Sequence, residues 1–212
     1  MPSMSASKPA DGKPYHHGDL RRALVDAARR LLEAEGPAAL SLRAVAREAG
    51  VSPAAPYHHF KDKSELLDAV AHDGWIMLDR AMTTAKAQAQ GHQRLSALGI
   101  AYVCFAREHP ALYRIMYDAA RNKEALPHVT EEDEESAYCK VRQTLVELGA
   151  DPKATVDLEL ATVAAWCAAH GLAEMAGFKQ FEHLIEALGG ETAFFRAVFS
   201  HMGLFPRPRH EV

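Results

Sequence analysis

The sequence has few cysteines and no long apolar stretch. Its 212 residues include three cysteines, and none of them stands in a C-x-x-C pair, so neither a disulfide framework nor a structural zinc site is predicted. It has no run of about 18 apolar residues and no basic, apolar leader, which disfavours a membrane span and a signal peptide. We therefore expect a cytoplasmic protein with reduced thiols and no membrane partner.

Common catalytic motifs are also missing. The chain has no G-x-S-x-G, no H-E-x-x-H and no glycine-rich phosphate loop. Twelve histidines keep one alternative open, an all-helical metal-dependent enzyme, because Asp68 with His72 and Cys167 with His170 have helix-face spacing. Neither pair has a third ligand nearby in the sequence. We expect a protein that is not an enzyme and that needs no metal or cofactor.

The charge is unevenly distributed along the chain. The net charge is −4, yet residues 1–63 hold ten Lys and Arg against seven Asp and Glu, while residues 64–212 hold fourteen against twenty-one. A positive end on an otherwise acidic chain is typical of a protein that binds nucleic acid at that end. The first third of the chain is therefore the candidate for binding DNA.

Apolar periodicity predicts an all-α protein, and no segment alternates like a strand. The expected helices span 18–35, 42–49, 52–60, 64–88, 93–108, 110–121, 131–148, 155–175 and 187–201. The acidic run 131–135 is expected to open its helix, where the dipole favours negative charge. Gly74 interrupts the helix over 64–88, and we expect it to be a close-packing site rather than a hinge.

The layout of a helix-turn-helix is recognisable in residues 40–66. Ser41 offers a side-chain oxygen to cap the first short helix. Ala46 and Gly50, four residues apart, supply the small residue for close packing and the glycine for a tight turn. Ser52 followed by Pro53 is a second helix start, and we expect that helix to continue to about Phe60.

This stretch resembles the amino-terminal domain of the TetR (tetracycline repressor-like) family of bacterial transcription regulators. The family signature V-S-x-x-x-x-Y-x-x-F-x-x-K-x-x-L is met by Val51, Ser52, Tyr57, Phe60, Lys63 and Leu66. Where the family mostly has leucine or isoleucine, this chain has Pro56, which we expect to keep the apolar packing but to distort the first turn, because proline lacks an amide donor. The resemblance implies a one-component regulator, most often a repressor, that binds a palindromic operator in double-stranded DNA as a homodimer.

The resemblance also implies which residues meet DNA. Arg43, Tyr57 and Lys63 match positions that contact the phosphate backbone, while short side chains and a histidine at the start of the second helix suit contacts to base edges. The complete expected DNA-binding set is Arg43, Ser52, Ala54, Ala55, Tyr57, His58, His59, Lys61 and Lys63.

A second resemblance lies near the carboxy terminus. Trp166, His170 and Gly171 look like the tryptophan-histidine-glycine (WHG) motif of a TetR-associated carboxy-terminal domain. Trp166 and His170 lie one helical turn apart, with Glu174 a further turn along to orient the imidazole. We expect a small, largely apolar effector near Tyr102, Phe105, Tyr117, Trp166 and His170, although Trp166 as ordinary core remains the alternative.

The domain prediction follows from these parts. We expect a disordered arm over 1–14, a helix-turn-helix DNA-binding domain over 15–63, and an antiparallel helical bundle for effector binding and dimerisation over 64–212. The homodimer is expected to form through the last two long helices, 155–175 and 187–201. Small alanines in the first of them and the bulky Leu188, Phe194, Phe195, Val198 and Phe199 in the second suit a four-helix interface. A helical adaptor that has lost DNA binding is the remaining alternative.

Overall fold

The computed structural model describes residues 17–122 and 136–202, and within these ranges the chain is entirely helical. The expected arm over 1–14 and the acidic run 131–135 lie outside the described residues. In chain order the elements are α1 (His17–Glu35), α2 (Leu42–Glu48), the 3-10 helix η1 (Ala55–His58), α3 (Lys63–Gln88), α4 (Gln93–Glu108), α5 (Pro110–Asn122), α6 (Ala137–Glu147), α7 (Thr155–Met175), the 3-10 helix η2 (Lys179–Phe181), α8 (Glu182–Ala187) and α9 (Glu191–His201). The all-α prediction is confirmed.

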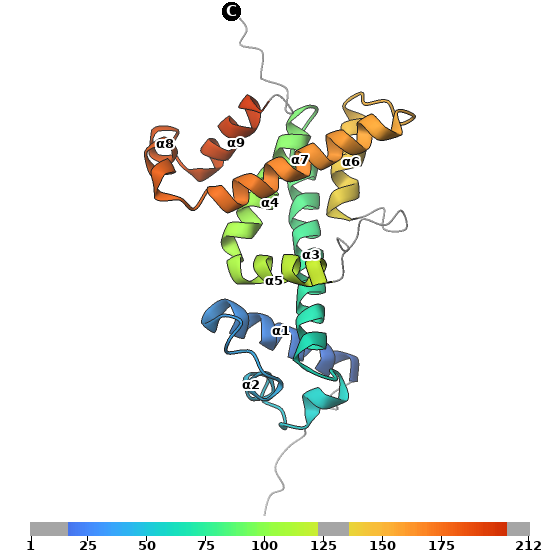
Figure 1. Ribbon diagram of the computed structural model, residues 1–212, viewed down its shortest axis with the longest axis vertical. Helices are drawn as coiled ribbons and strands as arrows, with labels where there is room; N and C mark the ends of the chain where they lie inside the picture. The colour runs from blue at the N-terminus through green and yellow to red at the C-terminus, as the bar shows by residue number, and fades with distance from the viewer. Residues whose placement is uncertain (1–16, 123–135, 203–212) are drawn as a thin grey trace, which may run out of the picture.

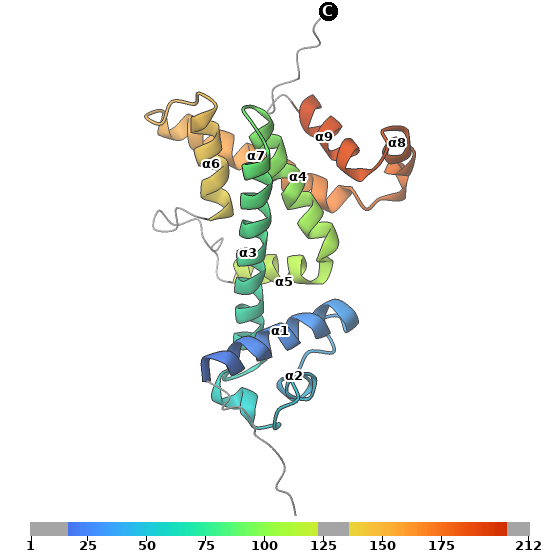
Figure 2. The same cartoon turned by 180° about the vertical axis from the view of Figure 1, so that it is seen from behind.

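Helix α3 connects the two ends of the molecule (Figures 1 and 2). At its start it packs against α1, beside α2 and η1, and further along it packs against α4 and α5. Helix α7 crosses over α4 and also packs against α6, while α9 packs against α4. Buried apolar residues from Leu24 to Phe199 form one connected core, so the amino-terminal helices are packed onto the bundle rather than hanging from a linker.

Local signals in the sequence account for the helix starts near the amino terminus. The Ser41 Oγ accepts a hydrogen bond from the Ala44 N–H at 3.1 Å, which satisfies a free amide at the start of α2. Gly50 has a φ of +68°, as the tight turn after α2 requires. At the start of α3, the Asp62 carboxylate accepts from the Glu65 N–H at 3.0 Å.

The second helix of the helix-turn-helix is shorter than expected. We expected an α-helix to about Phe60, but the structure has only the single 3-10 turn η1, over Ala55–His58. The reason is Pro56, which has no N–H to give to the Ser52 carbonyl, so the Ala55 N–H takes that acceptor at 3.0 Å instead. Pro56 is buried, which fulfils the packing role expected for it.

The last helix also differs from the prediction. We expected one helix over 187–201, whereas α8 ends at Ala187 and α9 begins at Glu191. Gly189 and Gly190 separate them with φ values of +85° and +125°, a conformation that ends a helix and that glycine adopts without steric cost.

Gly74 is a close-packing site, as predicted. A Cβ atom at this position would lie 2.6 Å from the Met116 Sδ and 3.0 Å from the Leu112 Cδ1. The missing side chain therefore allows α5 to lie directly on α3.

Candidate functional site

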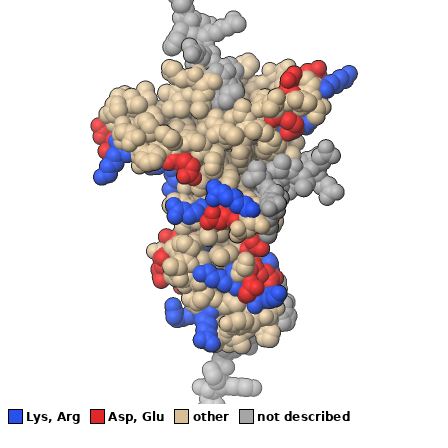
Figure 3. Space-filling view, viewed as in Figure 1, with Lys and Arg blue, Asp and Glu red and all other residues tan. Residues whose placement is uncertain are grey.

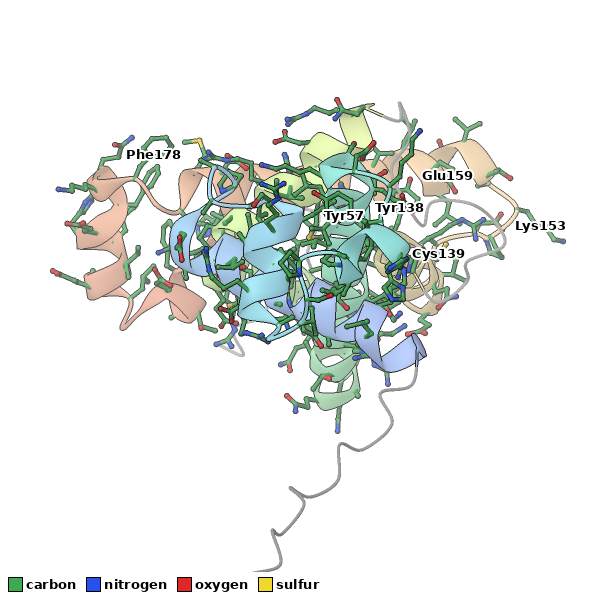
Figure 4. The ribbon with its side chains drawn as sticks, turned by 90° about the horizontal axis from the view of Figure 1, so that it is seen from below. Tyr57, Tyr138, Cys139, Lys153, Glu159 and Phe178 are labelled. Carbon is green, nitrogen blue, oxygen red and sulfur yellow. The ribbon has the colours of Figure 1, made fainter. Side chains whose placement is uncertain are left out.

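The predicted DNA-binding residues lie together at the free end of the amino-terminal helices. Seven of them are exposed, and Ala55 and His59 are half-buried. The exposed ones are Arg43, Ser52, Ala54, Tyr57, His58, Lys61 and Lys63. The Tyr57 side chain is 54% exposed, and in the view from that end its label lies near the middle of the molecule (Figure 4). A large exposed aromatic beside a histidine and basic residues forms a surface that suits a DNA groove.

Two basic residues near this surface have structural contacts of their own. The Lys63 Nζ donates to the Pro37 carbonyl at 3.0 Å, which ties the loop after α1 to the start of α3. The Arg21 guanidinium lies 5.2 Å from the Phe60 ring centroid, a cation–π distance. Lys63 therefore has a packing role in this structure beside the phosphate contact expected for it.

A buried carboxylate joins α1 to α3. The Asp73 side chain is 5% exposed, and its oxygens lie 3.0 Å from the Arg22 Nη1 and 3.5 Å from the Arg29 Nε. Asp26, on α1 itself, pairs with the same two arginines. We call Asp73, Arg22, Arg29 and Asp26 the Asp73 cluster, and it fixes the orientation of α1 on α3 because a buried carboxylate needs its charge partners.

The second candidate site is a cluster of hydroxyl groups around an imidazole. The Tyr102 hydroxyl lies 3.1 Å from the Tyr113 hydroxyl and 3.1 Å from the His170 Nδ1. It also hydrogen-bonds the Tyr117 hydroxyl, and the Tyr113 hydroxyl reaches the His170 Nδ1 at 2.5 Å. These four residues, which we call the tyrosine–histidine cluster, come from α4, α5 and α7.

The tyrosine–histidine cluster carries no charge. Burial raises the pKa of Tyr102 and Tyr113 far above the ordinary phenol value and that of Tyr117 to about 12. Burial also lowers the pKa of His170, with a smaller opposing effect from Glu174. Near neutral pH the phenols keep their protons and the imidazole is neutral, so its Nδ1 accepts a phenol hydrogen bond when the ring proton is on Nε2.

Two tryptophans flank the cluster. The Trp166 ring lies 5.2 Å from the Tyr102 ring, and the Trp75 ring lies 5.4 Å from the Tyr117 ring and 6.4 Å from Trp166. Next to these rings is a small apolar cavity lined by Met82, Leu95, Leu98, Gly99, Tyr102, Val141, Ala165, Trp166 and Ala169. The volume open to the centre of a water molecule is only about 10 Å³, room for roughly one water, so the structure shows this site closed.

The predicted effector residues are brought together except for one. Tyr102, Tyr117, Trp166 and His170 all belong to this aromatic region, whereas the Phe105 ring packs 5.1 Å from His109 instead. Tyr113 and Trp75 take its place. The imidazole is oriented by tyrosine hydroxyls rather than by Glu174, which is exposed, because phenols from neighbouring helices approach the buried Nδ1.

Comparison with known proteins identifies the chain. The sequence pattern of "Bacterial regulatory proteins, tetR family" matches residues 24–70, and that of "Tetracyclin repressor-like, C-terminal domain" matches residues 95–201. The chain belongs to the TetR family. The matched segments cover the helix-turn-helix and the bundle that holds the tyrosine–histidine cluster, so the resemblance seen in residues 40–66 is confirmed.

One curated relative matches part of this sequence, and two solved structures share its fold. The chain is 38% identical over 108 residues to the HTH-type transcriptional regulator BetI of Rhizobium meliloti (strain 1021), a match that spans 49% of this chain and 53% of that relative. A Rhodococcus sp. RHA1 structure of a protein with unknown function is 34% identical, with a TM-score of 0.66 over 91% of this chain and 97% of that one. The fatty acid degradation regulator FadR of Bacillus halodurans, 15% identical with a TM-score of 0.60 over 95% and 100% of the two chains, shares the fold.

Helix α7 exposes apolar side chains along one side, which we call its outer face. Val156 is 72% exposed, Leu160 63% and Val163 47%, and their spacing places them on one side of the helix. Figure 3, which views this side, shows Lys, Arg, Asp and Glu mostly over the lower half and a largely uncharged surface above.

The phenylalanines of α9 differ from the expectation, since Phe194, Phe195 and Phe199 are buried within the subunit. A Cβ at Gly99 of α4 would lie 2.8 Å from the Phe199 ring, which shows that α9 packs closely on α4. The apolar face of α9 is therefore covered by α4 of the same subunit.

The described residues contain neither a metal-binding group nor a membrane-spanning helix. Within 17–122 and 136–202, no group of three or more His, Cys, Asp or Glu side chains is arranged to hold a metal ion. None of the helices in the described ranges combines the length and apolar character that a membrane span requires. The TetR family consists of regulators rather than enzymes, and the chain is not an enzyme.

The Asp73 cluster gives a stability prediction. Asp73→Asn keeps the shape but removes the buried charge that both arginines of α1 face, and we expect the free energy of unfolding to fall by about 1–3 kcal/mol. Asp26→Asn, which weakens only partly exposed pairs within α1, is the matched control and should cost less than about 1 kcal/mol. Chemical denaturation of the two variants beside the wild type measures both; equal losses would show that Asp73 is no more than a surface partner.

Proposed function

We propose that this TetR-family chain is a transcriptional repressor that binds a palindromic operator as a homodimer and leaves it when a small, largely apolar effector binds. The observation that carries the proposal is the joint arrangement along α3. An uncovered helix-turn-helix surface lies at one end of this helix, and a closed aromatic site lies against its middle.

DNA contacts divide into two kinds in this proposal. Ala54, Ala55 and His58 lie on the η1 turn and its entry, where short side chains allow close approach to thymine methyls and the imidazole can donate to a purine edge. Arg43, on α2, and Lys61 are exposed at the margin, where they suit phosphate oxygens. The single-turn η1 makes a shorter reading element than an ordinary recognition helix, so few bases are read directly by each subunit.

A second copy of this chain is the partner proposed for the outer face of α7. Val156, Leu160 and Val163 form an apolar stripe there, and the small Gly171 further along leaves open space where a Cβ would lie. Leu184 and Leu188, at and just beyond α8, are also exposed. Because α9 is occupied by its own subunit, α7 and the segment around α8 supply the interface in this proposal.

In this proposal, helix α5 couples effector binding to the position of the helix-turn-helix. Tyr113 and Tyr117 on this helix belong to the tyrosine–histidine cluster, while Leu112 and Met116 on the same helix touch Gly74 of α3. Gly74 directly follows Asp73, which holds α1. An effector that separates the tyrosines displaces α5 and thereby α1, and a coupling of about 1–3 kcal/mol changes operator affinity about 5- to 150-fold.

The two kinds of DNA contact can be separated by selection from random duplex DNA. We expect His58→Ala to relax the selected sequence at one position in each half-site, since it removes a base-edge donor. Arg43→Ala should weaken all sequences about equally and flatten the salt dependence by about one unit, because it removes one phosphate contact.

Lys153→Ala is the control for these variants, because Lys153 is exposed and lies in the loop before α7, away from the helix-turn-helix (Figure 4). It removes the same charge and should leave both measurements unchanged. If the His58→Ala protein selects the same sequence as the wild type, the proposed base contact is refuted. If the wild-type protein selects no sequence at all, the proposal that the chain is a DNA-binding regulator is refuted.

The dimer is tested by placing a charge on α7. Leu160→Arg should reduce the mass measured by sedimentation equilibrium from two chains to one, and should lower operator affinity, because an unpaired charge in an apolar interface is costly. Thr84→Arg adds the same charge to an exposed position of α3 and should leave the dimer intact. Persistence of the Leu160→Arg dimer would place the interface elsewhere.

A further inference from the structure

The aromatic region has a buried hydrogen-bond donor with no acceptor. The Trp75 side chain is 4% exposed, and its indole Nε1 has no hydrogen-bond partner. The hydroxyls of Tyr102, Tyr113 and Tyr117, in contrast, can satisfy one another in a chain that ends on the His170 Nδ1. The closed site therefore lacks a hydrogen-bond acceptor for the indole N–H rather than a donor. Leaving a buried donor unmatched costs about 1–3 kcal/mol.

The site also lacks a counter-ion for a charged ligand. In the described part of the chain, the hydrogen bonds of the tyrosine–histidine cluster join phenols and one imidazole, and Tyr117 has a further side-chain hydrogen bond with the uncharged Trp166 indole. The charges of Glu174 and Arg121 act on the pKa of His170 in opposite directions. Arg121 is exposed and paired with Asp118 at 3.2 Å. A buried carboxylate would therefore lose its hydration without gaining a counter-ion, and an ammonium would gain only ring-face contacts.

The remaining walls suit a compact apolar body. The cavity beside the cluster is lined by Tyr102 of the cluster, by the flanking Trp166, and otherwise by aliphatic or small residues and Met82. The Trp75 and Trp166 rings are close to parallel, with an interplanar angle of 23°. These surfaces offer dispersion contacts to a ring, and the Trp75 and Tyr117 rings, whose centroids lie 5.4 Å apart, carry an N–H and an O–H donor.

We infer that the effector is an uncharged, compact, largely apolar molecule with one carbonyl oxygen, and that this oxygen accepts from the Trp75 indole N–H and the Tyr117 hydroxyl. The inference rests on the proposed function, since it takes this region as the effector site. Binding replaces the contact between the Tyr102 and Tyr117 hydroxyls with bonds to the ligand oxygen and satisfies the unmatched indole. A cation is disfavoured because the donors present their positive ends to it.

A ligand series on one carbon ring tests this inference with the full-length protein. The probes are cyclohexanone, methylenecyclohexane, cyclohexanecarboxylate and cyclohexylammonium, which differ in the group attached to the ring. The chain has two tryptophans, Trp75 and Trp166, so their fluorescence reports binding at the site, and the shift in unfolding temperature gives a second measure. We expect cyclohexanone to bind at least about ten-fold more tightly than the other three, the effect of one or two hydrogen bonds.

Two variants assign the preference to the indole. Trp75→Phe keeps an aromatic ring but removes the donor, and it should weaken cyclohexanone about five- to ten-fold while leaving methylenecyclohexane unchanged. Tyr138→Phe is the control, because the Tyr138 ring also contacts Trp166 at 5.8 Å while its hydroxyl donates to Glu159 at 3.0 Å, outside the cluster. It should leave the binding of both probes unaltered.

Several outcomes overturn the inference. They are the absence of saturable cyclohexanone binding, equal binding of cyclohexanone and methylenecyclohexane, tighter binding of the carboxylate or the ammonium, or a Trp75→Phe protein with the wild-type preference. Operator binding without any probe is measured on the same preparations. Intact operator binding with no ketone preference refutes the ligand class alone, whereas failure of the wild type to bind any operator refutes the proposed function.

Discussion

The buried Asp73 carboxylate is the constraint on which the arrangement of this protein depends. It sits on α3, faces Arg22 and Arg29 of α1, and is followed by Gly74, whose missing side chain lets α5 lie directly on α3. A buried charge must keep its partners, and a contact without a Cβ cannot be widened without leaving a void. Two consecutive residues of α3, Asp73 and Gly74, therefore fix α1 and α5 to α3. The helix-turn-helix can change its orientation relative to the bundle only if the contacts at these two residues rearrange.

The tyrosine–histidine cluster shares helix α5 with that junction. Its hydrogen bonds close the bundle with uncharged groups, and burial keeps the phenols protonated and the imidazole neutral near neutral pH. Such a network is stable when every member is satisfied, but the unmatched Trp75 indole leaves the closed state less favourable than it would otherwise be. A small cost in the closed state is what allows a weakly polar ligand to shift the equilibrium, because a ligand changes populations only by its difference in affinity for the two states.

The sequence predicted the parts that depend on local chemistry. Ser41, Gly50 and Gly74 behave as expected, since a cap, a positive φ and a helical glycine each act over a few residues. It could not show that Pro56 would reduce the second helix to one 3-10 turn, although it predicted the distortion. Periodicity shows that the α9 phenylalanines form an apolar face but not whether α4 or a second subunit covers it. For the same reason it favoured Phe105 over Tyr113, because the choice depends on how α4, α5 and α7 cross.

Helix α7 places two of the proposed functions on adjacent sides of one element. Trp166 and His170 contact the tyrosines of α4 and α5, while Leu160 and Val163 are exposed on the neighbouring side. Two recognition elements must lie about 34–36 Å apart, or a multiple of that distance, to meet successive major grooves on one side of DNA. In the proposed dimer the exposed sides of the two α7 helices are fixed against each other, so a displacement around Trp166 and His170 is not absorbed by movement of α7. It passes instead through α5 to Gly74 and Asp73, and the lever formed by α3 converts it into a change in the separation of the two helix-turn-helix surfaces.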